Sequence, residues 1–373
     1  MMIAQKSIKI VTTLLITLMS ITAYAGGGSG KGNPVDTKEE VKAYIKHHLK
    51  DSHDFHFYTD NASGTHYGFS LPVIVWTSNG LKTFMSSAFH HDDAGKVIVD
   101  KGDTKLVKFH SKIYELNQNV SAFNYNEEQH KALNATKVLD FSITKSVLGM
   151  LLAGLLMILG FGALAKGYKK GKSIPTGFAR VLEPLVIYVR DEIARPNIGE
   201  KKYRKFMPYL LTVFFFIWIL NLLGLTPLGF NVTGNIAVTA CLAIFTLVIY
   251  MTNGSKDFWA HTLWMPGVPK ILRPILALIE LVGFVLIKPF SLLVRLFANI
   301  TAGHFVVMSL IALMITMKEA FGPVASTGMS LALTLFIMVI ELLVAFLQAF
   351  IFTMLSALFI GMAVEEHDHD HAH

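Results

Sequence analysis

The stretch Pro289-Phe-Ser-Leu-Leu-Val-Arg-Leu-Phe-Ala-Asn-Ile-Thr-Ala-Gly-His304 decides the fold. Between Lys288 and Lys318 the chain is almost wholly apolar, and Arg295 is its only permanently charged residue. At about 1.5 Å of rise per residue, a helix of this length exceeds the roughly 30 Å hydrocarbon core of a bilayer. An arginine cannot release its proton at physiological pH, and placing it in mid-membrane costs about 2.5–3.5 kcal/mol, so it normally faces water or a partner carboxylate. The alternative is an arginine near a span end whose guanidinium reaches the headgroups.

The next apolar run, from Ser326 to Val364, has a similarly isolated charge. Glu341 is its only charged residue, and Gln348 follows seven positions later. Seven residues make about two helical turns, so these two side chains share a face, and Arg295 shares a face with Asn299 by the same rule. The alternative for the two amides is a hydrogen bond that only packs neighbouring helices.

The two runs predict an antiparallel hairpin in which polar groups meet at two depths. The register that places Arg295 opposite Gln348 also places His304 opposite Glu341, within about one helical turn. His304 and Glu341 can take up and release protons, whereas the amides can only form hydrogen bonds. The sequence therefore predicts a polar, titratable path between the last two helices.

These residues resemble a known family, the a subunit of F-type ATP synthase. The motifs that carry the resemblance are Lys288-Pro-Phe-Ser-Leu-Leu-Val-Arg-Leu-Phe-Ala-Asn-Ile-Thr-Ala-Gly-His304, Leu347-Gln-Ala-Phe-Ile-Phe352, Trp218-Ile-Leu-Asn-Leu-Leu-Gly-Leu-Thr-Pro227 and His261-Thr-Leu-Trp-Met-Pro-Gly-Val-Pro269. They extend over about residues 141–367 and leave the first third of the chain unmatched. The resemblance implies a stator subunit that forms two proton half-channels against a rotating ring of c subunits. Such a subunit couples proton translocation to ATP synthesis and is not catalytic by itself.

The resemblance also implies a role for each polar residue. Arg295 matches the gate that interacts with the carboxylates of the ring, and Asn299 and Gln348 match its neighbours. His304 and Glu341 match the inlet half-channel, although some relatives carry the acid and the histidine in exchanged positions. A further acid is Glu280, whose spacing to Arg295 is one residue longer than in some relatives. The alternative for Glu280 is an ordinary position at the membrane interface.

Composition independently indicates an all-α polytopic membrane protein. The chain is 53% hydrophobic and 16% charged, with a mean hydropathy of +0.49. The net charge of +7 lies in the first third and in short loops, which indicates topology and contact with acidic lipids rather than nucleic-acid binding. A single cysteine, Cys241, excludes an intramolecular disulfide, and we interpret it as a small core residue. A nucleotide-binding glycine loop is absent from the sequence, so we expect no cofactor.

We predict about five transmembrane helices and one amphipathic helix at the cytoplasmic surface. The lysines that follow the first span mark its cytoplasmic end. The last two spans form a long, tilted antiparallel hairpin that turns near residues 318–323. The other predicted segments are the spans 141–165, 207–223 and 235–252 and the amphipathic helix 175–195.

The first third predicts a separate region outside the cytoplasm. Residues 1–25 have the charged start, short apolar core and small-residue cleavage site of a signal peptide, with an uncleaved anchor as the alternative. Residues 26–137 predict a small α+β region with a helix at 38–49, strands at 69–76 and 96–101, and a turn at 90–95. Its histidines lack a known metal-ligand spacing, which favours a solvated surface over a metal site. Residues 138–364 form the membrane domain, and residues 365–373 are a cytoplasmic tail rich in histidine and acids.

The predicted location is therefore the bacterial inner membrane, with several passes, an extracytoplasmic N-terminal region and a cytoplasmic C-terminus. The implied partners are the c-subunit ring, b-type peripheral stalk subunits, the rest of the ATP synthase complex and membrane lipids, without nucleic acid. The competing function is an independent ion channel or an ion-coupled secondary transporter. That alternative is less well supported, because the chain has no internal repeat.

Overall fold

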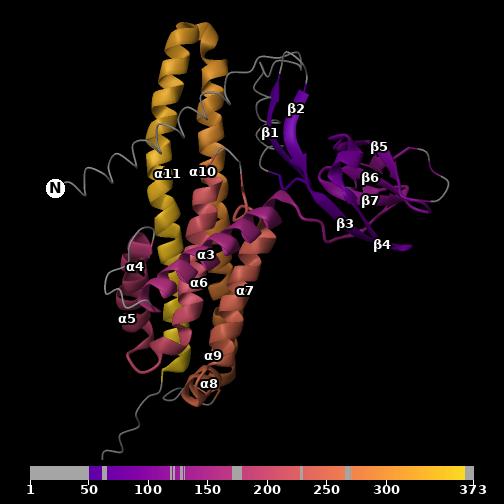
Figure 1. Cartoon of the computed structure of the whole chain (residues 1–373). Coiled ribbons are helices and arrows are strands. Elements are labelled where there is room, and N and C mark those ends of the chain that lie inside the picture. The colour runs from indigo at the N-terminus through magenta and orange to yellow at the C-terminus, as the bar shows by residue number, and fades with distance from the viewer. Residues whose placement is uncertain are drawn as a thin grey trace, which may run out of the picture. The chain divides into compact units, whose positions relative to one another are not determined.

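The fold is taken from a computed structural model of the chain, and Figure 1 shows its helices and strands. The structure describes residues 50–60, 65–117, 120, 122–126, 129, 131–169, 179–226, 230–264, 269 and 271–365. Two compact units are present. The first contains residues up to Met150 together with Thr226–Asn231 and Met308–Leu331, and the second contains the remainder.

The first unit contains four small antiparallel sheets. A hairpin joins β1 (Asp54–Asp60) to β2 (Thr65–Ser70), and a four-stranded sheet has the order β10-β7-β6-β5. A three-stranded sheet has the order β11-β3-β4, and β8 pairs with β9. The strands of these sheets are β3 (Pro72–Thr77), β4 (Gly80–Met85), β5 (Ala94–Asp100), β6 (Lys105–Phe109), β7 (Lys112–Leu116), β8 (Tyr125–Asn126), β9 (Lys131–Ala132), β10 (Ala135–Lys137) and β11 (Leu139–Asp140).

Alternating apolar residues from two of these sheets make the core of the β-rich region. Val73 and Val75 of β3 are completely buried, as are Phe89 and Leu106. Phe89 belongs to the short 3-10 helix η1 (Ser86–Phe89), which follows β4. Because strand side chains alternate between two faces, these valines place one face of β3 in the core and leave the other face outward.

Two sequence predictions for this region need correction. The segment 69–76 is not one strand, because β2 ends at Ser70 and β3 begins at Pro72, whose ring leaves no backbone donor. The strand β4 also intervenes before the turn, which the sequence reading missed. The predicted turn is present at His90 and His91, both with left-handed φ angles of 47° and 60°. The predicted helix at 38–49 and the signal peptide lie outside the described residues.

The first helix of the membrane part starts later than predicted. The helix α3 (Lys145–Lys169) begins after Phe141, whose N–H still donates to Ile74 O of β3 at 2.8 Å. The carboxylate of Asp51 accepts hydrogen bonds from Thr144 Oγ1 and from the N–H of Ser146, both at 3.0 Å. A carboxylate at a helix N-terminus satisfies free N–H groups and complements the helix dipole. Asp51 therefore fixes where the helix starts, which the apolar pattern alone did not reveal.

The chain then contains the helices of the second unit and the terminal hairpin. In chain order they are α4 (Ala179–Tyr188), η2 (Val189–Ala194), α5 (Arg195–Ile198), α6 (Tyr203–Gly224), α7 (Ile236–Thr252), α8 (Lys256–Leu263), α9 (Arg273–Val282), η3 (Gly283–Ile287), α10 (Lys288–Thr316) and α11 (Lys318–Val364). The segments η2 and η3 are single π-turns inside otherwise α-helical runs. Gly322, with φ 78°, breaks the start of α11 at the predicted turn.

Among the described residues, four helices are long and apolar enough to cross a membrane, and a fifth crossing results if α7 and α8 count as one bent span. The four are Lys145–Tyr168, Tyr203–Gly224, Arg273–Leu310 and Val324–Val364, and α7 and α8 meet at 102°. The chain is thus a mostly helical, multi-pass membrane protein, as the composition predicted.

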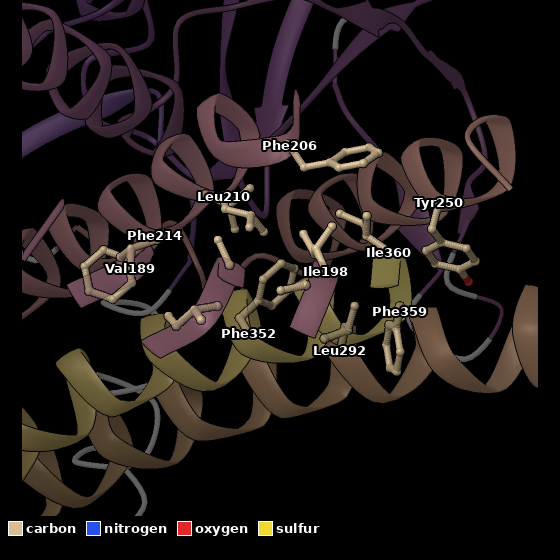
Figure 2. Packing of buried hydrophobic residues seen from close by; sticks show 14 of the residues in the cluster. Val189, Ile198, Phe206, Leu210, Phe214, Tyr250, Leu292, Phe352, Phe359 and Ile360 are labelled. Atoms are coloured by element: carbon tan, nitrogen blue, oxygen red, sulfur yellow. The ribbon is translucent and has the colours of Figure 1, made fainter. Parts of the chain in front are cut away.

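A large apolar cluster holds the second unit together (Figure 2). Leu210 and Phe214 of α6, Leu292 of α10 and Phe352 and Ile360 of α11 are nearly or completely buried in it. At about 1.5–3 kcal/mol for each fully buried large side chain, such contacts dominate the packing of these helices. The cluster therefore fixes α10 and α11 relative to each other within this unit.

The predicted amphipathic helix is present and joins this cluster. Its three segments α4, η2 and α5 bury Val189, Ile193 and Ile198 against the other helices, and Tyr188 lies with its ring centroid 5.8 Å from that of Phe350. Its polar face carries an ion pair between Arg195 and Asp191 at 2.9 Å. The segment is amphipathic as expected, but its apolar face packs against protein.

Cys241 is not the core residue that the sequence indicated. It is exposed on α7, where Ile244 and Phe245 are also more than half exposed. The physical reason is that lipid tails are themselves apolar, so an apolar residue on a membrane helix gains no preference for the protein interior. Of the C-terminal tail, Glu365 is described and residues 366–373 lie outside the described residues.

Candidate functional site

Arg295 lies on the uncovered side of α10. Leu292 and Leu296 of the same helix are 1% and 0% exposed, whereas the Arg295 side chain is exposed. Within the described part of the chain, no carboxylate lies within salt-bridge distance of its guanidinium. The structure therefore presents a permanent positive charge, near the middle of the apolar helical run Arg273–Leu310, to whatever lies outside this chain.

Glu341 lies against the backbone of α10 at Gly303. A Cβ placed on Gly303 would overlap the carboxylate of Glu341, so in this arrangement the acid fills the space that a side chain at position 303 would take. This contact sets the antiparallel register of α10 and α11 in the second unit, and it agrees with the predicted register to within one residue. His304, the next residue, is described by its backbone position on α10, so its pairing with Glu341 stays a prediction.

The two amides occupy different environments. Gln348 is 5% exposed and packs beside Ala345 and Ala349, whereas Asn299 is half-buried. Neither Gln348 Nε2 nor Asn299 Nδ2 has a hydrogen-bond partner among the described residues, although both atoms are buried. A buried donor without a partner costs about 1–3 kcal/mol, so each of these two donors needs a partner from outside the described residues, such as a water molecule. The predicted contact between Arg295 and Gln348 is not among the hydrogen bonds of the described residues.

A polar contact that the sequence reading did not assign holds α11 at this depth. Asn221 of α6 is 1% exposed; its Nδ2 donates to Ala345 O at 3.2 Å, and its Oδ1 accepts from Thr233 Oγ1 at 3.2 Å. Ala345 lies one turn after Glu341 and three residues before Gln348. Asn221 therefore fixes the height of both polar residues, and its only signal in the sequence was an asparagine inside an apolar span.

Glu280 lies at the other end of the same long helical run, on α9. It lines a cavity of about 160 Å³ together with Asp257 and His261 of α8 and Glu365 at the end of α11. The π-turn η3 lies between Glu280 and Arg295. A π-turn contains one residue more than an α-turn, so η3 shifts the helical phase between Glu280 and Arg295 by one residue.

The π-turn has a specific partner on α7. The hydroxyl of Tyr250, which is completely buried, donates to the carbonyl oxygen of Phe284 within η3. A π-turn misaligns backbone carbonyls, so a side-chain donor that satisfies one of them stabilises the turn. Lys288 follows directly, and its ammonium lies 3.1 Å from the ring centroid of Phe284.

A second set of buried hydroxyls connects three helices. Tyr209 Oη and Thr246 Oγ1 are 2.7 Å apart, and Thr246 Oγ1 and Ser356 Oγ are 3.5 Å apart. These residues lie on α6, α7 and α11 and did not stand out in the sequence. Their hydrogen bonds pair polar groups that an apolar surrounding would otherwise leave unsatisfied.

The described residues contain no group of three or more histidine, cysteine, aspartate or glutamate side chains arranged to hold a metal ion. The functional groups of the candidate site are therefore of two kinds. The hairpin carries one exposed guanidinium, one half-buried carboxylate and two free amide donors, and an acid-lined cavity lies beside α9. Such groups can attract anions, hold water and exchange protons.

Comparison with known proteins matches both parts of the chain. Residues 147–361 match the ATP synthase A chain family, and residues 44–141 match a domain of unknown function (DUF8433). ATP synthase subunit a of Chlorobium phaeobacteroides (strain BS1) is 46% identical over 243 residues, which are 63% of this chain and 70% of that protein. ATP synthase subunit a of Chloroherpeton thalassium is 45% identical over the same length and the same shares of the two chains.

Proposed function

The chain belongs to the ATP synthase subunit a family, and we propose that its Arg295 is the gate between two proton half-channels. Within the proton-transporting ATP synthase complex, this family supplies the proton-translocating, non-catalytic subunit of the membrane sector. The observation that carries the proposal is the exposed, unpaired guanidinium in the middle of an apolar helix.

Arg295 performs two tasks in this mechanism. Its fixed positive charge repels a proton that would otherwise pass directly from one half-channel to the other. The same charge favours the ionised form of a carboxylate that approaches it from a neighbouring subunit. A proton must therefore leave that carboxylate before it passes Arg295, and the only route across the membrane is on the moving partner. The neighbour that supplies these carboxylates is a c-subunit ring, with one carboxylate in each c subunit.

The residues of the hairpin supply the inlet half-channel. His304 and Glu341 exchange protons, and the free amide donors of Asn299 and Gln348 hold the water through which the protons move. The contact of Glu341 with Gly303 supports this assignment, because it brings the carboxylate next to the backbone position of His304. Asn221 keeps Glu341 and Gln348 at their heights by its bond to Ala345 O.

Glu280 and its cavity supply the outlet. The cavity lies beside the end of α11, close to the loop that the lysine pattern places on the cytoplasmic side, and its acids can accept protons released past Arg295. In this assignment His304, Asn299, Glu341 and Gln348 serve one side of the gate and Glu280 serves the other.

The subunit acts within the complex, and we infer which subunits it contacts there and how it is oriented in the membrane. The c-subunit ring faces Arg295, and b-type peripheral stalk subunits hold this stator chain against rotation. The location is the bacterial inner membrane, with the N-terminal region in the periplasm and the C-terminus in the cytoplasm. An independent channel or secondary transporter would need a complete path within one chain, whereas the exposed Arg295 needs a partner.

The test is ATP-driven proton pumping in inverted membrane vesicles without sodium. We expect the Arg295→Ala complex to assemble and to lose pumping, because both the barrier and the attraction for the partner carboxylate are removed. The matched control is Arg273→Ala, at the start of the same helical run, which should keep pumping. Coupled pumping at the normal rate in assembled Arg295→Ala complex would refute the gate.

A further inference from the structure

The strand β3 is apolar on both faces, and only one of them is covered by the residues that the structure describes. Its sequence, Pro72-Val-Ile-Val-Trp-Thr77, has no charged residue. Val73 and Val75 are completely buried in the core, while Trp76, on the other face, is 56% exposed. A continuous apolar run is typical of a strand with both faces covered, so the outward face lacks the cover that its sequence predicts.

The neighbouring strands extend this outward face. Trp76 pairs with Leu139 of β11 on one side and with Leu81 of β4 on the other. Directly paired residues of antiparallel strands point to the same face, so the three side chains form one row. Leu139 is 65% and Leu81 is 55% exposed, and Met85 of β4, on the same face, is 48% exposed. Thr83 is the polar residue among these outward positions of β4.

The same face continues into the first membrane span. Phe141, which is 62% exposed, and Ile143 alternate with Leu139 along the segment that leads to α3. The N–H groups of Phe141 and Ile143 donate to Ile74 O at 2.8 Å and Pro72 O at 3.1 Å, so this segment stays paired to β3. The span α3 begins two residues later, at Lys145, with its start held by Asp51.

We propose that the outer face formed by Leu81, Met85, Trp76, Leu139 and Phe141 binds the lipid bilayer at its interface, on the side where α3 begins. The face therefore anchors the N-terminal β-rich region to the membrane surface.

Two observations favour lipid over a protein partner as the occupant. The face leads directly into a candidate membrane span, because its last residue, Phe141, lies four residues before the start of that span at Lys145. Its chemistry is also that of an interfacial surface, since aromatic rings, tryptophan above all, and large aliphatic side chains insert between headgroups and acyl chains. An exposed apolar area of this kind on a water-soluble surface would mark a binding site in any case.

The experiment places a fluorescent label on the face of the full chain in nanodiscs. On a Cys241→Ser background, Leu81→Cys and Leu139→Cys are each labelled with the environment-sensitive dye NBD. The control is Lys96→Cys, an exposed position on β5, at the opposite edge of the four-stranded sheet from β10. All three substituted residues are exposed, so the fold is expected to tolerate them.

We expect nitroxide groups on the lipids to quench most of the fluorescence at positions 81 and 139, with little effect at position 96. Iodide in the water should show the reverse order. Iodide quenching at positions 81 and 139 that equals that at position 96 would overturn the proposal. Shielding of both positions from lipid and iodide alike would overturn it too, because the cover would then be a protein segment. The same labels in the assembled complex must give the same lipid quenching.

Discussion

At the scale of single residues, the proposed proton path along the hairpin depends on the contact between Glu341 and Gly303. The carboxylate occupies the space of a missing side chain, directly beside the backbone of His304. If imidazole and carboxylate are neighbours, the two groups are coupled and take up and release protons as a unit. Exchanging the two residues would then keep both charges and their contact.

We therefore expect the double variant His304→Glu with Glu341→His to recover much of the pumping rate that each single substitution loses. Such a non-additive result is typical of residues in contact. Rates of ATP-driven pumping are compared at matched abundance of the complex. A double variant no better than the slower single variant would mean that the two side chains do not meet.

Gly361, near the C-terminal end of α11, is a second position where the packing leaves no room for a side chain. A Cβ at this position would overlap the carbonyl oxygen of Asn197, and backbone atoms cannot move aside as a carboxylate can. We expect Gly361→Ala to lower the stability of the purified chain in detergent by about 1–3 kcal/mol or more, as overpacking does. The control is Gly328→Ala on the same helix, where no atom lies within 4 Å. Equal thermal unfolding temperatures of the two variants would contradict this steric account.

The sequence predicted the charged residues of the site better than the residues that position them. Arg295 and Glu341 stood out because each is the one charge in a long apolar run. Asn221 and Gly303 did not, because their roles depend on which atoms face them from another helix. The exposure of Arg295 together with the burial of Gln348 was equally hidden, since a lone helix has no inside or outside until it packs.

At the scale of elements, membrane helices were predictable and strands were less so. A bilayer imposes a length and an apolar composition on every span, so the sequence predicted α6, α7 and the hairpin to within a few residues. The strands depend on distant pairing, as when Leu139 pairs with Trp76. The π-turn η3 was not visible either, because Tyr250, which holds it, lies on another helix.

The β-rich region also carries a buried ionisable contact with a clear dependence on pH. His53, which is 2% exposed, lies with its Nε2 2.7 Å from Asp140 Oδ2. Burial raises the pKa of Asp140, but hydrogen bonds from His53 and Ser142 outweigh it and hold the pKa below its usual value. A carboxyl whose pKa is lowered by folding stabilises the fold above its unfolded pKa of about 3.9. This stabilisation is lost as the pH falls through the lower pKa of the folded state.

We expect Asp140→Asn to destabilise the β-rich region by about 1–3 kcal/mol at pH 7, where a buried partner is left without its carboxylate. The difference from the unmodified chain should begin to shrink below about pH 4 and disappear as the pH falls through the lower pKa of Asp140 in the folded state, because the carboxyl is then protonated in both states. Amide hydrogen exchange of strands β3 and β11 in the full chain measures both effects. Asp100→Asn, on the exposed face of β5, serves as the control and should change neither. A constant difference from pH 7 to pH 3 would contradict the role of the carboxylate.

At the scale of the whole molecule, the division into two units agrees with the side of the membrane on which each loop is predicted to lie. The first unit collects the N-terminal region, the loop after α6 and the turn between α10 and α11, all of which the lysine pattern places outside the cytoplasm. Phe55 of β1 and Phe230 of that loop have ring centroids 5.3 Å apart. Segments that pack together must lie on one side of the membrane, so this contact supports the prediction that the N-terminal region and the loop after α6 share a side.

The orientation can be tested with single cysteines on a Cys241→Ser background. We expect Asp103→Cys, in the turn between β5 and β6, to react with a membrane-impermeant maleimide in spheroplasts. Lys201→Cys, between α5 and α6, and His371→Cys, in the tail, should react only in inverted vesicles, because an odd number of crossings separates them from Asp103. Asp103→Cys and His371→Cys labelled from the same side would mean an even number of crossings. The bent pair α7 and α8 would then not span the membrane, and four crossings would replace five.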